Sequence, residues 1–287
     1  MKLQQVVEYK EGMKIEVGKY YLNMPNDIYH GSAGDSKSSL DVFHEDPYKY
    51  FHPKERKQTR PMQLGSAIHA ACLEPDVFNS EYILLPELKD RRQAEYKQAV
   101  KSFGEGKVFT NDDCKKITGM QKAVHANSEA HALLTAPGYF EVSGFSKDPE
   151  TGLLIRHRFD KLAFIDGDWV GVDLKKTQGA NQYKFSKSIW DYRYHVQDAI
   201  YSKGFEYITG LELSAFKFIA VEEEYPHKVA VYELCDASRK IGQDEARMDL
   251  NSLAEYKSGK IKAHNNSECE IISLPEWVLR QFEDEVI

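Results

Sequence analysis

The segment DWVGVDLKKT, residues 168–177, places an acid and an amine two positions apart near its end, at Asp173 and Lys175. Val170 and Val172 alternate with smaller or polar residues, which predicts a strand with one buried face. Side chains two positions apart on a strand point the same way and lie about 6.5–7 Å apart, so this acid and this amine can act on one ligand. The pair alone is common in solvated turns, and its role depends on what neighbouring strands contribute.

Two more carboxylates precede this pair on neighbouring predicted strands. Asp160 shares strand parity with Arg156 and Arg158, and Glu141 begins the strand before that. If these strands pair in register, three carboxylates converge beside the Lys175 ammonium group. Carboxylates repel one another unless a cation lies between them, and oxygen ligands favour Mg²⁺ or Mn²⁺. Such an ion stabilises charge on a phosphoryl oxygen, so the pattern indicates phosphodiester hydrolysis.

Three polar residues on predicted helices are weaker candidates. Gln197 and Tyr201 are four positions apart and share a helical face, from which they could brace the acids or contact a nucleic-acid backbone. Such pairs are more often surface or core packing. A lone histidine on an apolar helix, such as His69, is more often a core residue than a ligand.

The composition favours a folded domain that can position these residues. The 287 residues are 41% apolar and 12% aromatic, which suffices for one large domain with a buried core. We predict a single α/β domain in which residues 1–135 form a mainly helical N-terminal portion, 136–235 the catalytic core, and 236–287 a C-terminal helix and tail.

Apolar periodicity gives the elements of this domain. In the core, an antiparallel meander of three strands is continued through a crossover helix. Ser36 is the expected N-cap of the first helix. The predicted helices cover residues 36–51, 61–74, 90–103, 110–133, 187–208 and 236–258, and the predicted strands cover 139–147, 153–165, 169–177, 214–221 and 228–234.

The charge balance limits the ways in which the chain could bind a polyanion. Its formal net charge of −7 argues against a protein that coats nucleic acid by bulk charge, although a local basic groove is still compatible. The basic stretches 52–60 and 89–97 are candidates for such a groove, and equally for solvated surface. The sequence contains no run of about 18 apolar residues, the length that a membrane-spanning helix needs. Four cysteines without a CxxC pair fit a reducing cytoplasm.

Taken in chain order, five pieces of the sequence resemble the PD-(D/E)XK nuclease superfamily in its RecB-like branch. They are GSAIH (65–69), Glu141, RHRFD (156–160), VDLKK (172–176) and QDAIY (197–201). Within that branch the likeness is greatest to the RecE-type exodeoxyribonuclease VIII nuclease domain of phage recombination systems. The resemblance implies a restriction-endonuclease-like core, with a mixed sheet flanked by helices.

The resemblance also implies roles for individual residues. Asp160 and Asp173 would hold the metal, His69 would complete its ligand set, and Lys175 would assist the attacking water. In this superfamily the backbone carbonyl at the position of Leu174 commonly joins the metal ligands. Glu141 would match an additional acidic position, and Gln197 with Tyr201 would match the Q-x-x-x-Y motif of the branch.

Two positions depart from the family pattern or leave its register open. Phe159 stands where the family has proline before its first catalytic acid, a replacement that keeps strand propensity. Lys176 directly follows Lys175, so a shift of one residue would assign the other amine. Strand parity with Asp173 favours Lys175.

The activity implied by the resemblance is a Mg²⁺-dependent 5′→3′ double-strand DNA exonuclease, with Mn²⁺ as a substitute, that leaves 3′ single-strand overhangs. ATP independence agrees with the absence of a G-x-x-x-x-G-K-[ST] motif. Subunits would form a ring, such as a tetramer, around duplex DNA and deliver the overhang to a single-strand annealing protein. The expected DNA contacts are Arg91, Arg92, Arg156 and Arg158. The expected location is the cytoplasm of a bacterial host, with a phage or prophage as the source and no membrane partner.

Two other functions stay open from the sequence. One is a RecB-like nuclease acting on single strands, although such relatives often carry an iron–sulphur cluster held by four cysteines, which the scattered cysteines disfavour. The other is a catalytically silent scaffold that binds DNA ends in recombination. Replacing Asp173 by alanine separates turnover from binding alone.

Overall fold

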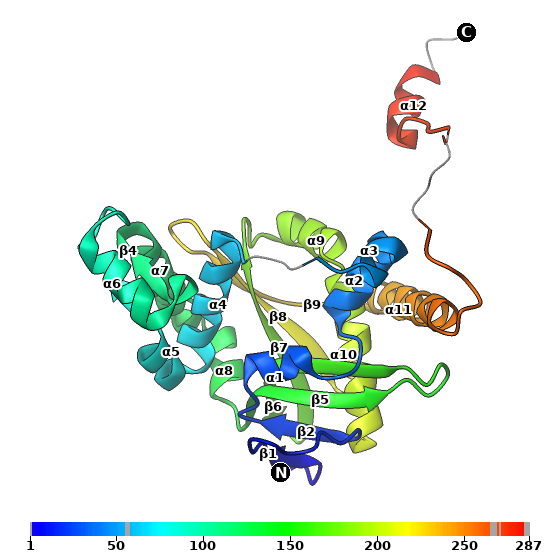
Figure 1. Cartoon of the computed structure of the whole chain (residues 1–287), viewed down its shortest axis with the longest axis horizontal. Coiled ribbons are helices and arrows are strands. Elements are labelled where there is room, and N and C mark those ends of the chain that lie inside the picture. Colours follow the sequence, from blue (N-terminus) through cyan, green and yellow to red (C-terminus); the bar gives the residue numbers. More distant parts are fainter. Residues whose placement is uncertain (1, 55–57, 265–268, 270, 284–287) are drawn as a thin grey trace.

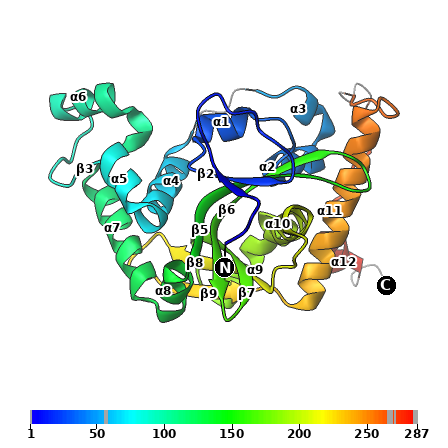
Figure 2. The same cartoon turned by 90° about the horizontal axis from the view of Figure 1, so that it is seen from below.

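A seven-stranded mixed sheet forms the centre of the protein, with helices on both of its faces (Figures 1 and 2). The computed structural model describes residues 2–54, 58–264, 269 and 271–283. The strand order is β1-β2-β5-β6-β7-β8-β9. The strands are β1 (Val6–Glu8), β2 (Lys19–Leu22), β5 (Gly138–Lys147), β6 (Leu154–Ile165), β7 (Asp168–Thr177), β8 (Ala215–Glu222) and β9 (Val229–Glu233). This architecture confirms the predicted α/β fold class.

The predicted meander is present as β5, β6 and β7, which pair antiparallel in sequence order. The turn between β6 and β7 has two residues, Asp166 and Gly167, with positive φ angles of 52° and 100°. Asp-Gly in this conformation suits a tight hairpin because its twist matches that of the flanking strands. The turn pairs Ile165 with Asp168 and so fixes the register of both strands as far as the acids.

The crossover after β7 consists of two helices, so the prediction of one helix over 187–208 was wrong. They are α9 (Gln182–Asp191) and α10 (Tyr194–Thr209), and β8 then pairs parallel to β7. The helical path is interrupted at Arg193, whose backbone is left-handed with φ of 51°. Its guanidinium group contacts Asp41, Glu245 and Asp249, and these tertiary ion pairs outweigh local helix propensity.

Two other predicted helices are each divided into two. Residues 36–51 form α2 (Lys37–Glu45) and α3 (Pro47–Phe51), and residues 110–133 form most of α7 (Asn111–Ala126) and α8 (Ser128–Thr135). In each case an Asp or Asn side chain caps the second helix, Asp46 at Tyr48 N and Asn127 at Ala130 N. Ser36 caps α2 as predicted, in a reciprocal capping box with Ser39.

The N-terminal portion is helical only after its first strands. β1 and β2 extend the sheet beside β5, and Tyr20 and Tyr21 of β2 are fully buried. The prediction did not include these strands because three or four residues are too few for a periodic signal. The other elements of this portion are α1 (Asn26–Gly31), α4 (Arg60–Leu73), α5 (Pro75–Glu81), α6 (Ala94–Phe103), and the small parallel pair β3 (Ile83–Leu85) and β4 (Val108–Thr110).

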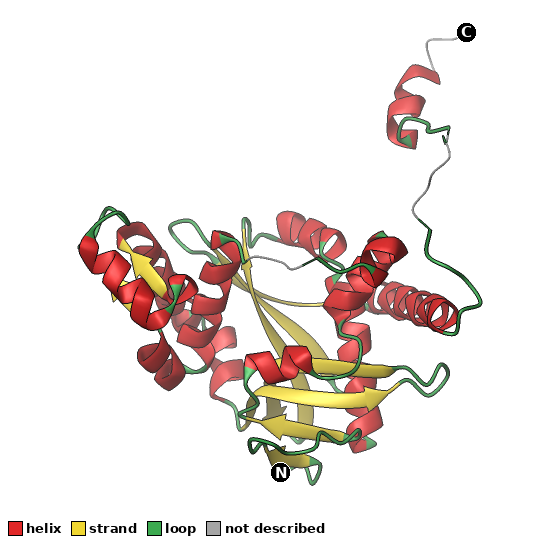
Figure 3. Ribbon diagram, viewed as in Figure 1, coloured by secondary structure: helices red, strands yellow, loops and turns green. Residues whose placement is uncertain are grey.

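Each face of the sheet carries its own apolar core. On one face Val172 and Leu174 of β7 pack with residues of α4, α7 and α8, among them Ile68. On the other face Phe216 and Phe218 of β8 pack with residues of α9 and α10. α11 (Asp236–Lys257) packs outside α10, and α12 (Glu276–Glu283) lies away from the body (Figures 1 and 3). Within the described residues no helix is long and apolar enough to cross a membrane.

Candidate active site

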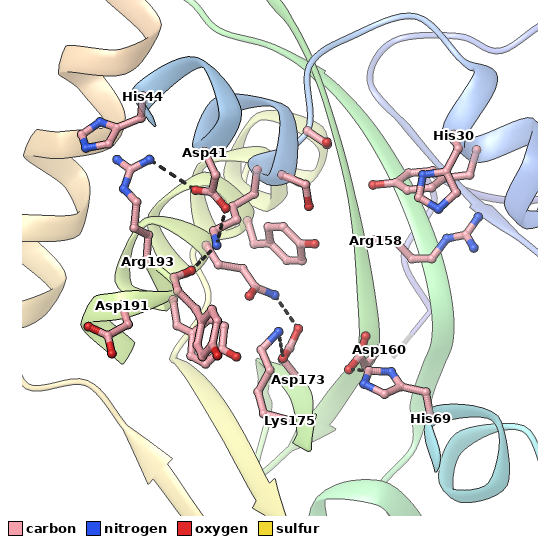
Figure 4. Close-up of a pocket in the computed structure, with 18 of the residues that line it drawn as sticks. His30, Asp41, His44, His69, Arg158, Asp160, Asp173, Lys175, Asp191 and Arg193 are labelled. Atoms are coloured by element: carbon pink, nitrogen blue, oxygen red, sulfur yellow. Dashed lines mark hydrogen bonds and ion pairs between the residues drawn. The ribbon is translucent and has the colours of Figure 1, made fainter. Parts of the chain in front are cut away.

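A cavity of about 860 Å³ opens where the middle of β6 and the C-terminal half of β7 face α2, α4 and α10 (Figure 4). Its lining includes Asp160, Asp173, Lys175 and His69, so residues far apart in the sequence meet as predicted. Because Val172 and Leu174 are buried on the opposite face, strand alternation turns Asp173 and Lys175 into the cavity.

The register of β6 and β7 brings the two aspartates together. The backbone ladder runs from Ile165 opposite Asp168 to Lys161 opposite Val172. One step further, Asp160 accepts a hydrogen bond from the backbone N–H of Leu174 at 2.7 Å through its carboxylate. A side chain therefore replaces the next main-chain contact, and it fixes Asp160 beside Asp173. The amide of Leu174 thus positions Asp160, while the predicted metal contact of its carbonyl remains a prediction.

Three candidate ligands from three elements gather around Asp160. One ligand atom each of His69, Glu141 and Asp160 lie within 4.8 Å of one another. His69 comes from α4, and its Nδ1 is 3.4 Å from Asp160 Oδ2. Glu141 interrupts β5, where its neighbours Phe140 and Val142 stay paired with β6 while its own backbone is left-handed with φ of 44°. A non-glycine residue in this region carries strain, which is often found at functional sites.

The electrostatics of these acids fit a cation site. The pKa of Asp160 is raised to about 6, mainly by burial and secondly by repulsion from Asp173. The pKa of Glu141 is raised well above its usual range, again mainly by burial and secondly by repulsion from Asp160. A bound cation would relieve both effects, because it replaces lost hydration and screens the repulsion. The mixed donor set of carboxylates and one imidazole fits a divalent ion.

Asp173 is held by its own set of partners. Gln197 Nε2 donates a hydrogen bond to Asp173 Oδ1, and Lys175 Nζ lies 2.6 Å from Oδ2 (Figure 4). Gln197 therefore braces an acid, which is one of the two roles predicted for it. Burial opposes the charge of Lys175, but Asp173, Tyr194 and Asp160 together raise its pKa. The ammonium also lies 4.6 Å from the ring centre of Tyr194.

The structure confirms that Lys175, not Lys176, faces the acids. Lys176 pairs instead with Glu223 on the other side of the strand. Phe159 is fully buried in the core beside α10, and the ring of Tyr201 packs edge-on against it with centres 5.2 Å apart. The replacement of the family proline therefore adds core packing and leaves the next side chain in the cavity. Tyr201 itself lines the cavity together with Gln197, and its role in the motif remains a prediction.

The four arginines predicted to bind DNA occupy different places. Arg158 lines the cavity. Its guanidinium carbon lies 4.2 Å from the ring centre of Tyr29, and its Nε donates a hydrogen bond to the Ser143 hydroxyl. Arg156 does not line it and donates to the Ser32 carbonyl. Arg91 and Arg92 also lie outside the cavity lining, and each pairs with an acid: Arg91 with Asp113, which Arg60 shares, and Arg92 with Asp90. Their contact with DNA remains a prediction.

One wall of the cavity was not predicted. It comes from α1, α2 and the start of α10, and its residues include Tyr29, Ser36, Lys37 and Tyr194. Lys37 lies 2.7 Å from Asp41 and close to the Tyr192 carbonyl, so it joins α2 to the loop before α10. SKSS (36–39) is an ordinary helix-start pattern and YRY (192–194) lies inside the helix predicted over 187–208, so only the tertiary fold reveals that they border the acids.

A family model agrees with this geometry. Residues 48–275 match the PDDEXK-like domain of unknown function DUF3799. The chain belongs to this family. The match spans both the helical portion that carries His69 and the strands that carry the acids. It supports a nuclease of the PD-(D/E)XK superfamily, whose members generally use divalent metal ions.

One solved structure shares the fold of this DUF3799 protein. A proposed exonuclease from Eubacterium rectale is similar with a TM-score of 0.61 and 11% sequence identity, over 91% of this chain and 99% of that chain. The protein SSO0001 has a TM-score of 0.30 and 13% identity, over 69% of this chain and 88% of that chain. No curated protein matches the sequence.

Proposed function

We propose that this DUF3799 protein is a Mg²⁺-dependent, ATP-independent 5′→3′ double-strand DNA exonuclease that leaves 3′ overhangs for annealing recombination. The observation that carries the proposal is the meeting of Asp160, Asp173 and Lys175 in one cavity, with His69 and Glu141 beside them. Polarity, duplex preference and a ring of subunits around the DNA come from the resemblance to RecE-type nucleases.

The residues of the chain divide the chemistry between them. His69, Glu141 and Asp160 would hold Mg²⁺, with Asp173 alongside, and the bound ion would supply Lewis-acid stabilisation of charge on the phosphate. Lys175 keeps its proton, because its acidic neighbours raise its pKa, and so presents N–H donors to the water or the phosphate. Gln197 fixes the orientation of Asp173. The strands hold these groups more rigidly than loops would.

The test uses linear duplex DNA labelled at either the 5′ or the 3′ end, beside a closed circle, in Mg²⁺ and in EDTA. We expect early release of the 5′ label, an intact circle and no release in EDTA. Asp173→Asn should reduce the rate at least about 100-fold, as the loss of a preorganised catalytic group does. Asp168→Asn is the matched control, since Asp168 is an exposed residue at the other end of the same strand.

Three other results would each contradict a different part of the proposed function. Nicking of the circle would replace the exonuclease by an endonuclease on the same residues. Wild-type rates in Asp173→Asn would remove this site from the reaction. Binding of DNA ends without any digestion, in Mg²⁺ or Mn²⁺, would favour the silent scaffold.

A further inference from the structure

A second cavity of about 500 Å³ adjoins the active-site cavity and shares Asp191, Tyr192 and Tyr194 with it. α9 forms much of its wall, together with the end of β7 and Pro61. In Figure 1, α9 lies at the upper rim above β7 and β8. We propose that this cavity and the exposed face of α9 bind the single-stranded part of the DNA that flanks the scissile bond. The proposal rests on the nuclease function proposed above and adds a substrate contact to it.

The first observation is a set of exposed aromatic rings. Tyr183 is 83% exposed, and Trp190 and Tyr192 are each 62% exposed. Tyr183 and Trp190 are seven positions apart on α9, with Lys187 between them at helical spacing, so they share one face of the helix. Large rings left in solvent contribute little to the core and offer surfaces on which bases can stack.

The second observation is that stacked rings lead from this face to the catalytic lysine. Tyr192 stacks on Tyr194 with ring centres 5.7 Å apart and planes 25° apart. Tyr194 in turn lies 4.6 Å from Lys175 Nζ. A strand whose phosphate lies at Lys175 would therefore meet Tyr194 and then Tyr192, at the boundary shared by both cavities. The outer face of the exposed Tyr192 ring offers a stacking surface to an unpaired base, whose face a duplex would hide.

The third observation is the charge of the groove. Its lining includes Lys176, Lys184 and Lys187 and the acid Asp191. Lys176 is paired with Glu223, whereas Lys184 and Lys187 have no acid within ion-pair distance among the residues that the structure describes. Ammonium groups without acidic partners are available to phosphates. Rings and free amines together favour single-stranded DNA over an acidic peptide, which would need the amines alone.

Gly179 shows how the fold positions one of these amines. A Cβ atom at Gly179 would lie 2.3 Å from Cδ and 2.9 Å from Cβ of Lys184. The lysine stem therefore lies directly on the backbone after β7, where a larger residue would displace it. This contact holds the stem of Lys184 in the groove.

The test measures binding of a fluorescent oligothymidylate to the full chain in EDTA, where hydrolysis does not contribute. Tyr183→Ala/Lys187→Ala should weaken binding about fivefold or more, since one stacked base is lost. The dependence of log affinity on log salt should also become shallower by about 0.7, the value for one lost single-strand phosphate contact. The matched control is Lys203→Ala/Tyr207→Ala, which removes an exposed amine and ring at the same spacing on α10 and should bind like the wild type.

The outcomes separate this proposal from the nuclease proposal. Wild-type affinity in Tyr183→Ala/Lys187→Ala overturns the single-strand site, even where the protein digests duplex DNA in Mg²⁺. Equal competition by polyglutamate and by unlabelled oligothymidylate also overturns it, in favour of an acidic peptide site. Failure of the wild type to digest DNA overturns the nuclease proposal alone, because the binding measurement does not depend on turnover.

Discussion

Gln197 is the residue through which α10 contacts Asp173, the acid for which we propose a catalytic role. Its amide donates to Asp173, and no other described side chain except Lys175 contacts that carboxylate in a bond or ion pair. The sequence predicted this residue from a four-residue spacing, but the acid that it holds became clear only from the fold. Positioning residues of this kind affect the ligand that they orient more than the stability of the protein.

We therefore expect Gln197→Ala to lower activity and metal affinity by about 10- to 100-fold while the protein stays folded. The measurement is the rate of duplex digestion as a function of Mg²⁺ concentration, where the variant should require more metal. Gln243→Ala, on the exposed face of α11, is the control and should match the wild type. An unchanged Mg²⁺ dependence in Gln197→Ala would show that Gln197 does not orient Asp173.

His157 shows a second residue-scale effect, outside the active site. It is fully buried between Tyr20, Phe159 and Tyr201, and the Tyr20 hydroxyl lies 3.0 Å from its Nε2. A Cβ atom on Gly204 would lie 2.3 Å from its ring, so the packing leaves no room for hydration. Burial lowers the pKa of His157 to about 3.

This lowered pKa predicts that the folded state loses stability in acid. The folded state holds the pKa of His157 below the ordinary value of about 6.5, so the unfolded chain binds the proton first and folding loses stability as pH falls. The contribution is complete above about pH 6.5 and is lost toward about pH 3. Between about pH 7 and pH 5 the free energy of unfolding should fall by about 2 kcal/mol from this group. In urea titrations His157→Gln should remove this part of the pH dependence, and an unchanged difference between the two pH values would contradict the assignment.

At the scale of elements, the break between α9 and α10 is set by ion pairs rather than by local sequence. Arg193 joins the break to α2 through Asp41 and to α11 through Glu245 and Asp249. Its side chain is 12% exposed. α9 lines mainly the second cavity and α10 mainly the active-site cavity, and Asp191 and Tyr194 at the junction line both, so the junction sets the position of the two helices around the cavities.

Arg193→Ala should therefore destabilise the protein by roughly 2–3 kcal/mol, less than a fully buried network because some solvent reaches it. Urea unfolding gives the value. Lys240→Ala, which breaks an exposed i,i+4 pair on α11, should cost at most about 0.5 kcal/mol. Equal effects of the two substitutions would mean that the Arg193 network does not maintain the junction.

The meander from β5 to β7 was predictable because long alternation and an Asp-Gly turn are local signals. The acids on β6 and β7 were predictable because strand parity fixes their direction. The left-handed backbone of Glu141, the wall carrying Lys37 and the short strand β2 depend on contacts distant in sequence, which periodicity does not encode.

At the scale of the whole molecule, a divalent ion should stabilise the folded state. The acids that repel one another in the metal-free protein come from the sheet, and the histidine comes from α4. An ion that binds only the folded protein adds about 2.7 kcal/mol when its concentration is 100 times its dissociation constant. For a domain of this size that corresponds to a rise in Tm of several degrees.

Thermal unfolding in Mn²⁺ or Mg²⁺ and in EDTA measures this effect. The Tm should rise with metal in the wild type and in Asp168→Asn, and the rise should be largely lost in Glu141→Gln. A rise that persists in Glu141→Gln would move the ion to other ligands. A wild-type Tm that does not respond to saturating metal would contradict a site built from these residues.

His69 belongs to the helical portion, whereas Glu141 and Asp160 belong to the sheet, so the three candidate ligands lie as far as 91 positions apart in the chain. An ion held by all three is a reversible cross-link between those parts. Local opening of α4 away from the sheet would then require the ion to leave. Amide hydrogen exchange in α4 should slow when metal is added, at sites that touch neither the ion nor DNA. The exchange rate of amides in α4 would thus indicate whether the metal site is occupied.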